Sequence, residues 1–240
     1  MTSSPAAPLL ELSSIVKDYH GLRPLRIERF ALDAGDLVAI AGLDAASAEA
    51  FVNIATGAAL PEQGRITLFG RNSASITDSA DWLSLVDRFG IVSTRAVLLD
   101  QLSVVQNLAI PFSLDIDPLG DALRARAAAA GREAGLSDAD FDRRVADVDA
   151  AARLRVRVAR ALALDPAIVL LEHPSAELPR EESARLGAEI RETLARRGVA
   201  GLALTADAEF SRAFASRILT LHGGSGRLSD ARRGWLGRFL

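Results

Sequence analysis

The sequence predicts an α/β fold in which a mostly parallel sheet is flanked by helices. Two observations support this prediction. Short apolar runs with the length of buried strands, such as 37–42 and 167–171, alternate with longer segments of helical pattern. The chain has 240 residues, of which 49% are hydrophobic, so it is large and apolar enough to bury a full core.

The elements are expected in a definite order. Apolar patterning and turn residues predict strands at 9–16, 25–32, 37–42, 65–69, 90–92, 167–171, 199–204 and 217–221, the last of these closing the fold. Helices are expected at 47–56, within a lobe at 115–147, at 150–164 and at 180–197. Gly57 follows the first helix in the position that favours a left-handed C-terminal residue.

Composition narrows the function. The formal net charge is −3 and the charges are spread along the chain, which argues against a nucleic-acid partner. The absence of cysteine excludes disulfides and thiolate metal sites. No stretch has the pattern of a signal peptide or the length of a membrane span, so we expect a cytoplasmic protein. Of the 28 lysine and arginine residues only Lys17 is a lysine, and it lies two strands before the loop that begins at Gly42.

Five segments resemble, in order and spacing, the nucleotide-binding domain of ABC transporters. These are AGDLVAIAG, GRITLFGR, LSVVQNLAIPF, RVRVARALALDPAIVLLEHPSAEL and LALTADAEFSRAFASRILTL. The resemblance covers nearly the whole chain, and STRAVLLDQLSVVQNLAIPF is most similar to the subfamily that drives lipid transport between bacterial membranes. It implies one P-loop NTPase-like, nucleotide-binding-like domain over 1–240, with an antiparallel β edge and a helical lobe at about 100–160.

The resemblance places a degenerate Walker A loop at 42–50. In the motif G-x-x-x-x-G-K-[ST], glycines let backbone N–H groups face phosphate, the lysine neutralises charge and the hydroxyl binds Mg²⁺. Here Ser47 replaces the second glycine, Ala48 the lysine and Glu49 the hydroxyl. We expect a plain helix N-terminus with Ser47 as its cap and an acidic first turn. The loop positions implied as nucleotide-binding are Gly42, Ala45, Ser47, Ala48, Glu49 and Ala50.

Other motif positions implied by the resemblance also depart from the family's nucleotide-binding residues. They are Thr94 in the Q-loop, Asp149, Ala150 and Ala151 in the signature, and Ala206 in the H-loop. Asp149 would turn a negative charge toward a γ-phosphate, and it also suits the N-cap of helix 150–164. Tyr19 stands where the family stacks an aromatic ring on adenine; it either stacks there or packs in the core.

The Walker B strand ends in Glu172 and His173. A glutamate can bind Mg²⁺ and a histidine can act as a general base, so this pair alone does not exclude hydrolysis. We interpret His173 as a histidine at a strand end that hydrogen-bonds Glu172. The isolated His20 and His222 predict no metal site.

The apolar segment 97–112 lies where the family receives the coupling helix of a permease. It is either a retained docking surface or part of the core. The candidate partner-binding residues are Val97, Leu98, Leu99, Leu102, Val104 and Val105. Arg153, Arg157 and Arg160 share one helix face, interpreted as solvated. The tail 235–240 carries two aromatic residues and docks either on this chain or on a partner.

Two main hypotheses follow. In the first, the chain is a catalytically degenerate ABC-type subunit, a structural or regulatory partner of a membrane permease, of an active ATP-binding subunit or of both, on the cytoplasmic face of the inner membrane and without cofactor or metal. In the second it is a divergent active ATPase that uses ATP and Mg²⁺, with Glu172 binding the metal, His173 as base and Arg95 or another arginine replacing the lysine. A third interpretation, an unrelated α/β protein, is disfavoured by the five spaced matches.

Overall fold

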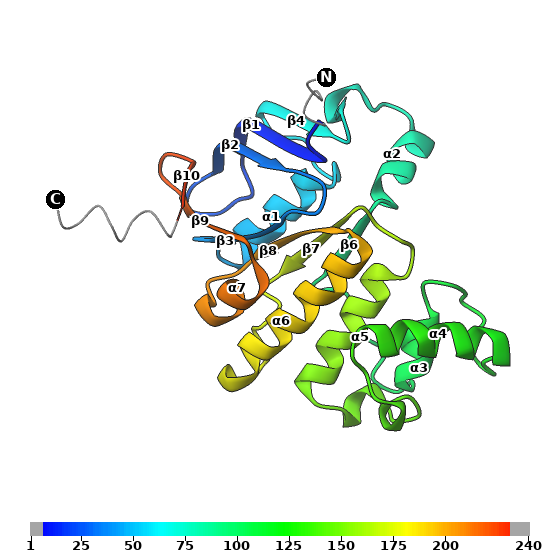
Figure 1. The fold of residues 1–240 in the computed structure, drawn as a ribbon. Coiled ribbons are helices and arrows are strands. Elements are labelled where there is room, and N and C mark those ends of the chain that lie inside the picture. The colour runs from blue at the N-terminus through cyan, green and yellow to red at the C-terminus, as the bar shows by residue number, and fades with distance from the viewer. Residues whose placement is uncertain (1–6, 231–240) are drawn as a thin grey trace, which may run out of the picture.

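The computed structural model describes residues 7–230 (Figure 1). Its strands are β1 (Leu10–Lys17), β2 (Leu25–Leu32), β3 (Leu37–Ala41), β4 (Gln63–Leu68), β5 (Arg71–Asn72), β6 (Phe89–Val92), β7 (Ile168–Glu172), β8 (Ala200–Leu204), β9 (Arg217–His222) and β10 (Arg227–Asp230). Its α-helices are α1 (Ala45–Ala55), α2 (Ser79–Val86), α3 (Val104–Ala109), α4 (Asp121–Glu133), α5 (Ala150–Leu162), α6 (Arg180–Arg197) and α7 (Ala208–Phe214).

The strands form two sheets. The larger has the order β10-β9-β3-β8-β7-β6, and all neighbours from β9 to β6 are parallel while β10 pairs with β9 antiparallel. The smaller sheet is antiparallel, with the order β2-β1-β4-β5. The predicted α/β class, with a mostly parallel sheet and an antiparallel β edge, is therefore confirmed.

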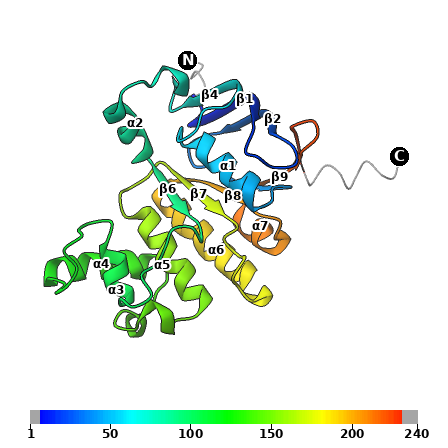
Figure 2. The same ribbon diagram turned by 180° about the vertical axis from the view of Figure 1, so that it is seen from behind.

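Each face of the parallel strands has its own hydrophobic core. Successive side chains of a strand point to opposite faces, so Ile168 and Leu170 of β7 pack with α1 and the antiparallel sheet, whereas Val169 and Leu171 pack with α5, α6 and α7. Figures 1 and 2 show α1 between the two sheets and the longer helices on the other side. Helices α3 and α4 lie beside α5, at the end of the molecule away from the antiparallel sheet (Figure 2).

The sheet order brings the candidate residues to one edge. The carboxyl ends of neighbouring parallel strands meet at the same edge of a sheet. The loops that follow β3, β6, β7 and β8 therefore lie at this edge. In that order they contain the start of α1, residues 93–99, His173 and Ala206.

Several element predictions were wrong in detail. The first helix begins at Ala45 rather than at 47. The helical lobe predicted at 115–147 contains α4 and two short 3₁₀ turns (Asp138–Asp140 and Val145–Asp147), so its α-helix covers less of the segment than expected. The strand at 217–221 is followed by β10, which the sequence did not predict. Three helices were also missed; they are α2, α3 and α7, each of eight residues or fewer, too short for a clear period. Within residues 7–230 no helix has the length and apolarity of a membrane span.

Candidate functional site

The connection from β3 to α1 carries the loop that the sequence singled out. Gly42 has a left-handed φ of +93°, and a Cβ on it would lie 2.5 Å from the carbonyl oxygen of Leu221 in β9. Glycine alone tolerates both the φ angle and this close approach. The backbone packing against β9 therefore requires Gly42, whatever the loop binds.

Asp44, not Ser47, caps α1. The Asp44 carboxylate accepts hydrogen bonds from the Ser47 N–H at 2.8 Å and from the Ser47 hydroxyl at 2.6 Å. These bonds, the hydroxyl first, hold the pKa of Asp44 below its ordinary value. The predicted cap and the predicted acidic first turn were both wrong, because the helix starts two residues earlier and Glu49 lies in its second turn. The positive end of the helix dipole already faces a carboxylate of this chain.

The residue in the lysine position is enclosed by the core. Ala48 has no exposed surface and Ala50 is 6% exposed, and both pack in the apolar cluster between the two sheets. Ala45 is exposed at the start of the helix. The one lysine, Lys17, is engaged elsewhere: its ammonium donates to the Leu60 carbonyl at 2.9 Å and pairs with Glu62 at 2.7 Å.

Two glutamates converge on one guanidinium. Arg95 Nη1 donates to Glu49 Oε1 at 2.9 Å, while Arg95 Nε and Nη2 donate to the two carboxylate oxygens of Glu172 at 3.1 and 2.5 Å. The Glu172 side chain is 8% exposed, against 41% for Arg95 and 46% for Glu49. The bond to Glu172 is the main reason that the pKa of Arg95 is raised, helped by the charges of both glutamates against partial burial. We call Glu49, Arg95 and Glu172 the Arg95 cluster.

Sequence reasoning had noted Arg95 only as a candidate replacement for the missing lysine. The parallel order β6-β7 is the signal that could have paired it with Glu172, because Arg95 follows the end of β6 as Glu172 ends β7. Thr94, its neighbour, is exposed.

The predicted hydrogen bond between His173 and Glu172 is not formed. Glu172 bonds Arg95, and His173 follows it in a left-handed conformation with a φ of +44°. Consecutive residues at a strand end point in different directions, which separates the two side chains. His173 Nε2 is buried and has no hydrogen-bond partner among the described residues. Its backbone N–H donates to Leu204 in β8 at 2.9 Å.

The H-loop position offers a capping carboxylate in place of an imidazole. Ala206 precedes Asp207, which caps α7 by accepting from the N–H groups of Glu209 and Phe210 at 2.9 and 3.1 Å. Burial raises the pKa of Asp207, but bonds from Phe210, Ser183 and Ser175 outweigh it and leave the pKa lowered.

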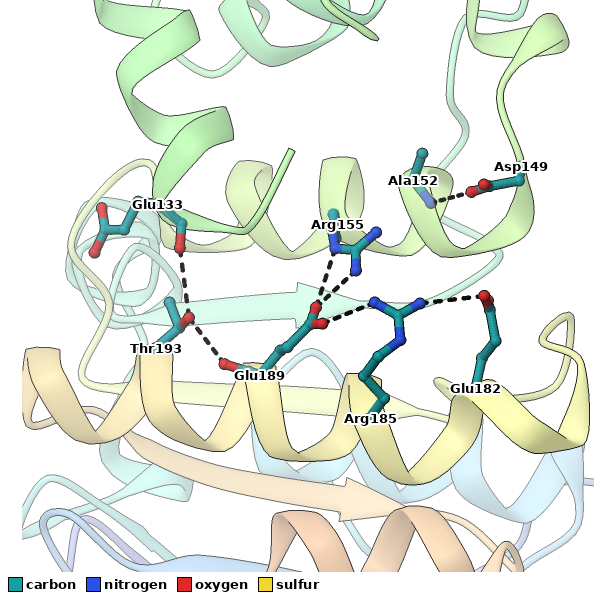
Figure 3. Close-up of polar contacts among 8 residues, drawn as sticks. All are labelled: Glu133, Asp149, Ala152, Arg155, Glu182, Arg185, Glu189 and Thr193. Carbon is teal, nitrogen blue, oxygen red and sulfur yellow. Dashed lines mark hydrogen bonds and ion pairs between the residues drawn. The ribbon is translucent and has the colours of Figure 1, made fainter. Parts of the chain in front are cut away.

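The signature position forms an ordinary helix start. Asp149 caps α5, as the sequence predicted, by accepting from the Ala152 N–H at 2.7 Å (Figure 3). Ala150 and Ala151 follow in the first turn, and Ala151 is 2% exposed. Arg153 donates to the Val145 and Ala146 carbonyls at 3.2 and 3.1 Å and fastens the turn before α5.

An open groove remains beside the loop. It has a volume of about 870 Å³ and is lined by residues 19–26, by Gly42 and neighbouring loop residues, and by Leu221 and the turn after β9. Tyr19 is half-buried, with its ring against Gly21, where a Cβ would lie 2.5 Å away. Tyr19 therefore both packs against the core and lines the groove, so neither of its two predicted roles is excluded.

Curated relatives align along most of the chain. The lipoprotein-releasing system ATP-binding protein LolD of Alcanivorax borkumensis is 26% identical over 86% of this chain and 91% of its own length. The phosphonates import ATP-binding protein PhnC of Hyphomonas neptunium is 28% identical over 95% and 88% of the two chains. The methionine import ATP-binding protein MetN of Brucella abortus is 25% identical over 91% of this chain and 58% of its own. No family model matches the chain.

Solved structures agree with the fold. CbiO1 of Clostridium perfringens, described as part of the ABC transporter complex cbiONQ, superimposes with a TM-score of 0.79 over 97% of this chain and 92% of its own, at 18% identity. The bacterial ABC transporter cassette MJ0796 gives a TM-score of 0.73 over 92% and 98%, at 21% identity. The chain has the ABC cassette fold. It also resembles the ATP-binding subunits of ABC transporters in sequence, as predicted.

The cassette's candidate partner segment divides into two sets. Leu98, Val104 and Val105 are at most 8% exposed and pack in the core with α4 and α5, which favours the core alternative for these three residues. The short α3 turns its apolar face inward and leaves Leu102 partly covered. Val97 and Leu99 are 68% and 44% exposed.

The cassette has a second cavity beside Ala96. It measures about 330 Å³ and is lined by apolar groups that include Ile91, Ala96 and Leu164, and by Arg157 and Arg160. The prediction that the arginine face of α5 is solvated was wrong. Arg157 is 12% exposed and pairs with Glu177 at 2.9 Å, and Arg160 donates to the Val97 carbonyl at 2.9 Å. Burial is the main cause of the lowered pKa of Arg160, with the charge of Arg157 adding to it.

Proposed function

We propose that this chain is a catalytically degenerate ABC-type ATP-binding subunit that acts as a structural or regulatory partner within a transporter. Its partners are a membrane permease, an active ATP-binding subunit or both. The proposal includes one cassette domain over 1–240, with a helical lobe at about 100–160, and no bound ATP, Mg²⁺ or other cofactor.

The observation that carries the proposal is the Arg95 cluster. The glutamates at the positions of the metal-binding hydroxyl and of the Walker B carboxylate share one guanidinium of the same chain, which leaves the three groups with a net charge of −1. Asp44 adds a negative charge at the helix N-terminus, where a phosphate would otherwise bind. The residues present therefore do not fit Mg²⁺ and a triphosphate.

The magnitudes support the same conclusion. A carboxylate about 4 Å from a phosphate costs roughly 4 kcal/mol at an effective dielectric constant near 20. Loss of the lysine removes an attraction of about the same size. Micromolar affinity corresponds to only about 8 kcal/mol, so these two changes suffice to abolish it.

Partners and location are proposed from the relatives and from the exposed apolar surface at the 330 Å³ cavity. LolD, MetN and PhnC are named as ATP-binding proteins of transport systems, and CbiO1 as part of a transporter complex. Val97 and the cavity lined by Leu164 offer apolar surface for a permease segment. We propose a peripheral position on the cytoplasmic face of the inner membrane, held by these partners, and lipid transport as the process, in view of LolD.

The alternative is a divergent active ATPase. Two observations favour it: the open groove lined by Tyr19, and His173 Nε2, which has no partner among residues 7–230 and could accept a proton. Arg95 is an obstacle to this alternative, because its donors are already divided between Glu49 and Glu172.

A nucleotide titration separates the two functions. We expect the purified chain to show no saturable binding of a fluorescent ATP analogue with Mg²⁺ below about 0.1 mM, since the loop lacks a compensating cation. We also expect no thermal shift at millimolar ATP, whereas a ligand at a hundred times its Kd stabilises by about 2.7 kcal/mol.

The ATP-binding protein LolD of A. borkumensis, treated in parallel, is the positive control. Saturable binding to this chain below about 0.1 mM, followed by phosphate release, would replace the proposed function with the ATPase alternative.

A further inference from the structure

The Arg95 cluster joins three distant parts of the chain. Glu49 lies 46 residues before Arg95 and Glu172 lies 77 residues after it. They belong to α1, to the loop after β6 and to the end of β7. One guanidinium therefore connects the loop helix, the Q-loop segment and the Walker B strand through three hydrogen bonds.

Further hydrogen bonds hold the rest of segment 93–99. The Arg95 N–H donates to the Ser93 hydroxyl at 3.1 Å, and Arg160 of α5 donates to the Val97 carbonyl at 2.9 Å. Leu99 is held twice by the fully buried Asn107, whose Oδ1 accepts from the Leu99 N–H at 2.8 Å and whose Nδ2 donates to the Leu99 carbonyl at 3.0 Å.

We infer that Arg95 is a built-in cation that links α1, segment 93–99 and β7, and so holds this segment in one arrangement without metal or nucleotide. The inference rests on the proposed function and deepens it. Segment 93–99 also borders the 330 Å³ cavity through Ala96, and Arg160 of α5, which donates to the Val97 carbonyl, lines the same cavity. A permease segment seated there would meet the same surface whether or not ATP is present.

The chemistry of arginine suits this role. The guanidinium remains charged at every physiological pH, and its planar fork donates in two directions at once. Unlike a bound ion, it is attached covalently and cannot dissociate. The carboxylate pair that it bridges is of the kind that hard divalent cations also bind.

Amide hydrogen exchange in the full chain tests the inference. Without nucleotide, we expect segment 93–99 to be protected in the wild type and to exchange at least about tenfold faster in Arg95→Met. Arg124→Met is the matched control, because Arg124 has a similar exposure of 43% and, within residues 7–230, pairs only with Asp142 on the surface; it should leave the segment unchanged. Glu49→Gln keeps the bond to buried Glu172 and should loosen the segment less, which provides a milder variant if Arg95→Met folds poorly.

Divalent cations supply a second measurement. In Arg95→Met two carboxylates lose their shared cation, so MnCl₂ should raise the melting temperature of this variant by several degrees and leave the wild type unchanged. Glu49→Gln with Arg95→Met removes one ligand and should lose the manganese effect.

Three results would overturn the inference: unchanged exchange of segment 93–99 in both Arg95→Met and Glu49→Gln, equal loosening by Arg124→Met, or the same manganese shift in wild type and Arg95→Met. These measurements contain no nucleotide. Binding of ATP to the wild type would refute the proposed function, whereas the role of Arg95 would still be decided by the exchange of segment 93–99.

Discussion

Asp44 places a carboxylate where the first turn of α1 would attract an anion. The Ser47 N–H and hydroxyl both point to it, so that the orphan donors of the helix start are satisfied by the chain itself. The same contact lowers the pKa of Asp44, so the stability of the helix depends on whether this carboxyl group is charged.

Asp44→Ala is expected to destabilise the chain by about 1 kcal/mol at neutral pH, the usual cost of an N-cap. The expected fall in melting temperature is about 2–4 °C for a chain of this size. Urea unfolding and thermal melts measure both. Asp44→Asn keeps an acceptor oxygen without the charge and should cost less.

The pH dependence has a definite sign. The folded pKa of Asp44 lies below the ordinary value of 3.8, so its charge stabilises the fold above that value and the contribution is lost as pH falls through the folded pKa. The stability difference between wild type and Asp44→Ala should be constant from about pH 7 to about pH 5 and shrink below about pH 4. A difference that grows on acidification would contradict this account.

At the scale of elements, a polar network fastens α5 to α6 (Figure 3). Arg155 donates through two nitrogens to Glu189 at 3.1 and 2.8 Å, and Arg185 joins Glu189 to Glu182 at 2.8 and 3.1 Å. Thr193 adds a bond to the Glu133 carbonyl of α4. The signature helix is thus tied to its neighbours by side chains as well as by apolar packing.

Arg155→Met should destabilise the chain by about 1–2 kcal/mol, because Arg155 is only 15% exposed and its removal leaves Glu189 with Arg185 alone. A double-mutant cycle with Glu189→Gln should give a coupling of about 0.5–1 kcal/mol. The exposed pair Arg212–Glu209 is the matched control and should give less. Equal coupling in both pairs would mean that α5 and α6 gain nothing from this network.

The sequence predicts best those elements whose pattern is local. The buried strands β3, β7 and β8 are continuous apolar runs, and α6 ends where Gly198 adopts a φ of +65°. Helices such as α3 are too short for a visible period and depend on caps and tertiary packing. Strand β10 exists because it pairs with β9, which no local pattern reveals.

The same distinction holds for the candidate site. Local sequence sufficed to show that the Walker A lysine is absent and that Asp149 caps its helix. The bonds of Arg95 to Glu49 and Glu172 could not be found in this way, because they span 46 and 77 residues and depend on the order of strands in the sheet. His173 was misassigned for a related reason, since its direction follows from a left-handed backbone angle.

At the scale of the whole molecule, the Arg95 cluster and the 330 Å³ cavity are neighbours, because Ala96 follows Arg95 and lines the cavity. Arg95 and Val97 lie two residues apart in one anchored segment, and Arg160 joins that segment to α5. Under the proposed function, such a cassette would keep its docking face although the charges of its own side chains disfavour a nucleotide. The proposed permease contact is therefore separable from ATP use, and it can be tested on its own.

Val97→Asp and Leu164→Asp should each weaken the proposed permease contact about 10- to 100-fold, because burying one such side chain contributes about 1.5–3 kcal/mol. Both residues are well exposed, at 68% and 56%, so the melting temperature should change little. Leu22→Asp is the matched control: Leu22 is fully exposed but lines the groove beside Tyr19. Tagged full-length chains purified from the native host, with bound proteins identified by mass spectrometry, provide the measurement. A permease that is retained equally by Val97→Asp and Leu164→Asp, or lost equally with Leu22→Asp, would remove this face as the docking surface.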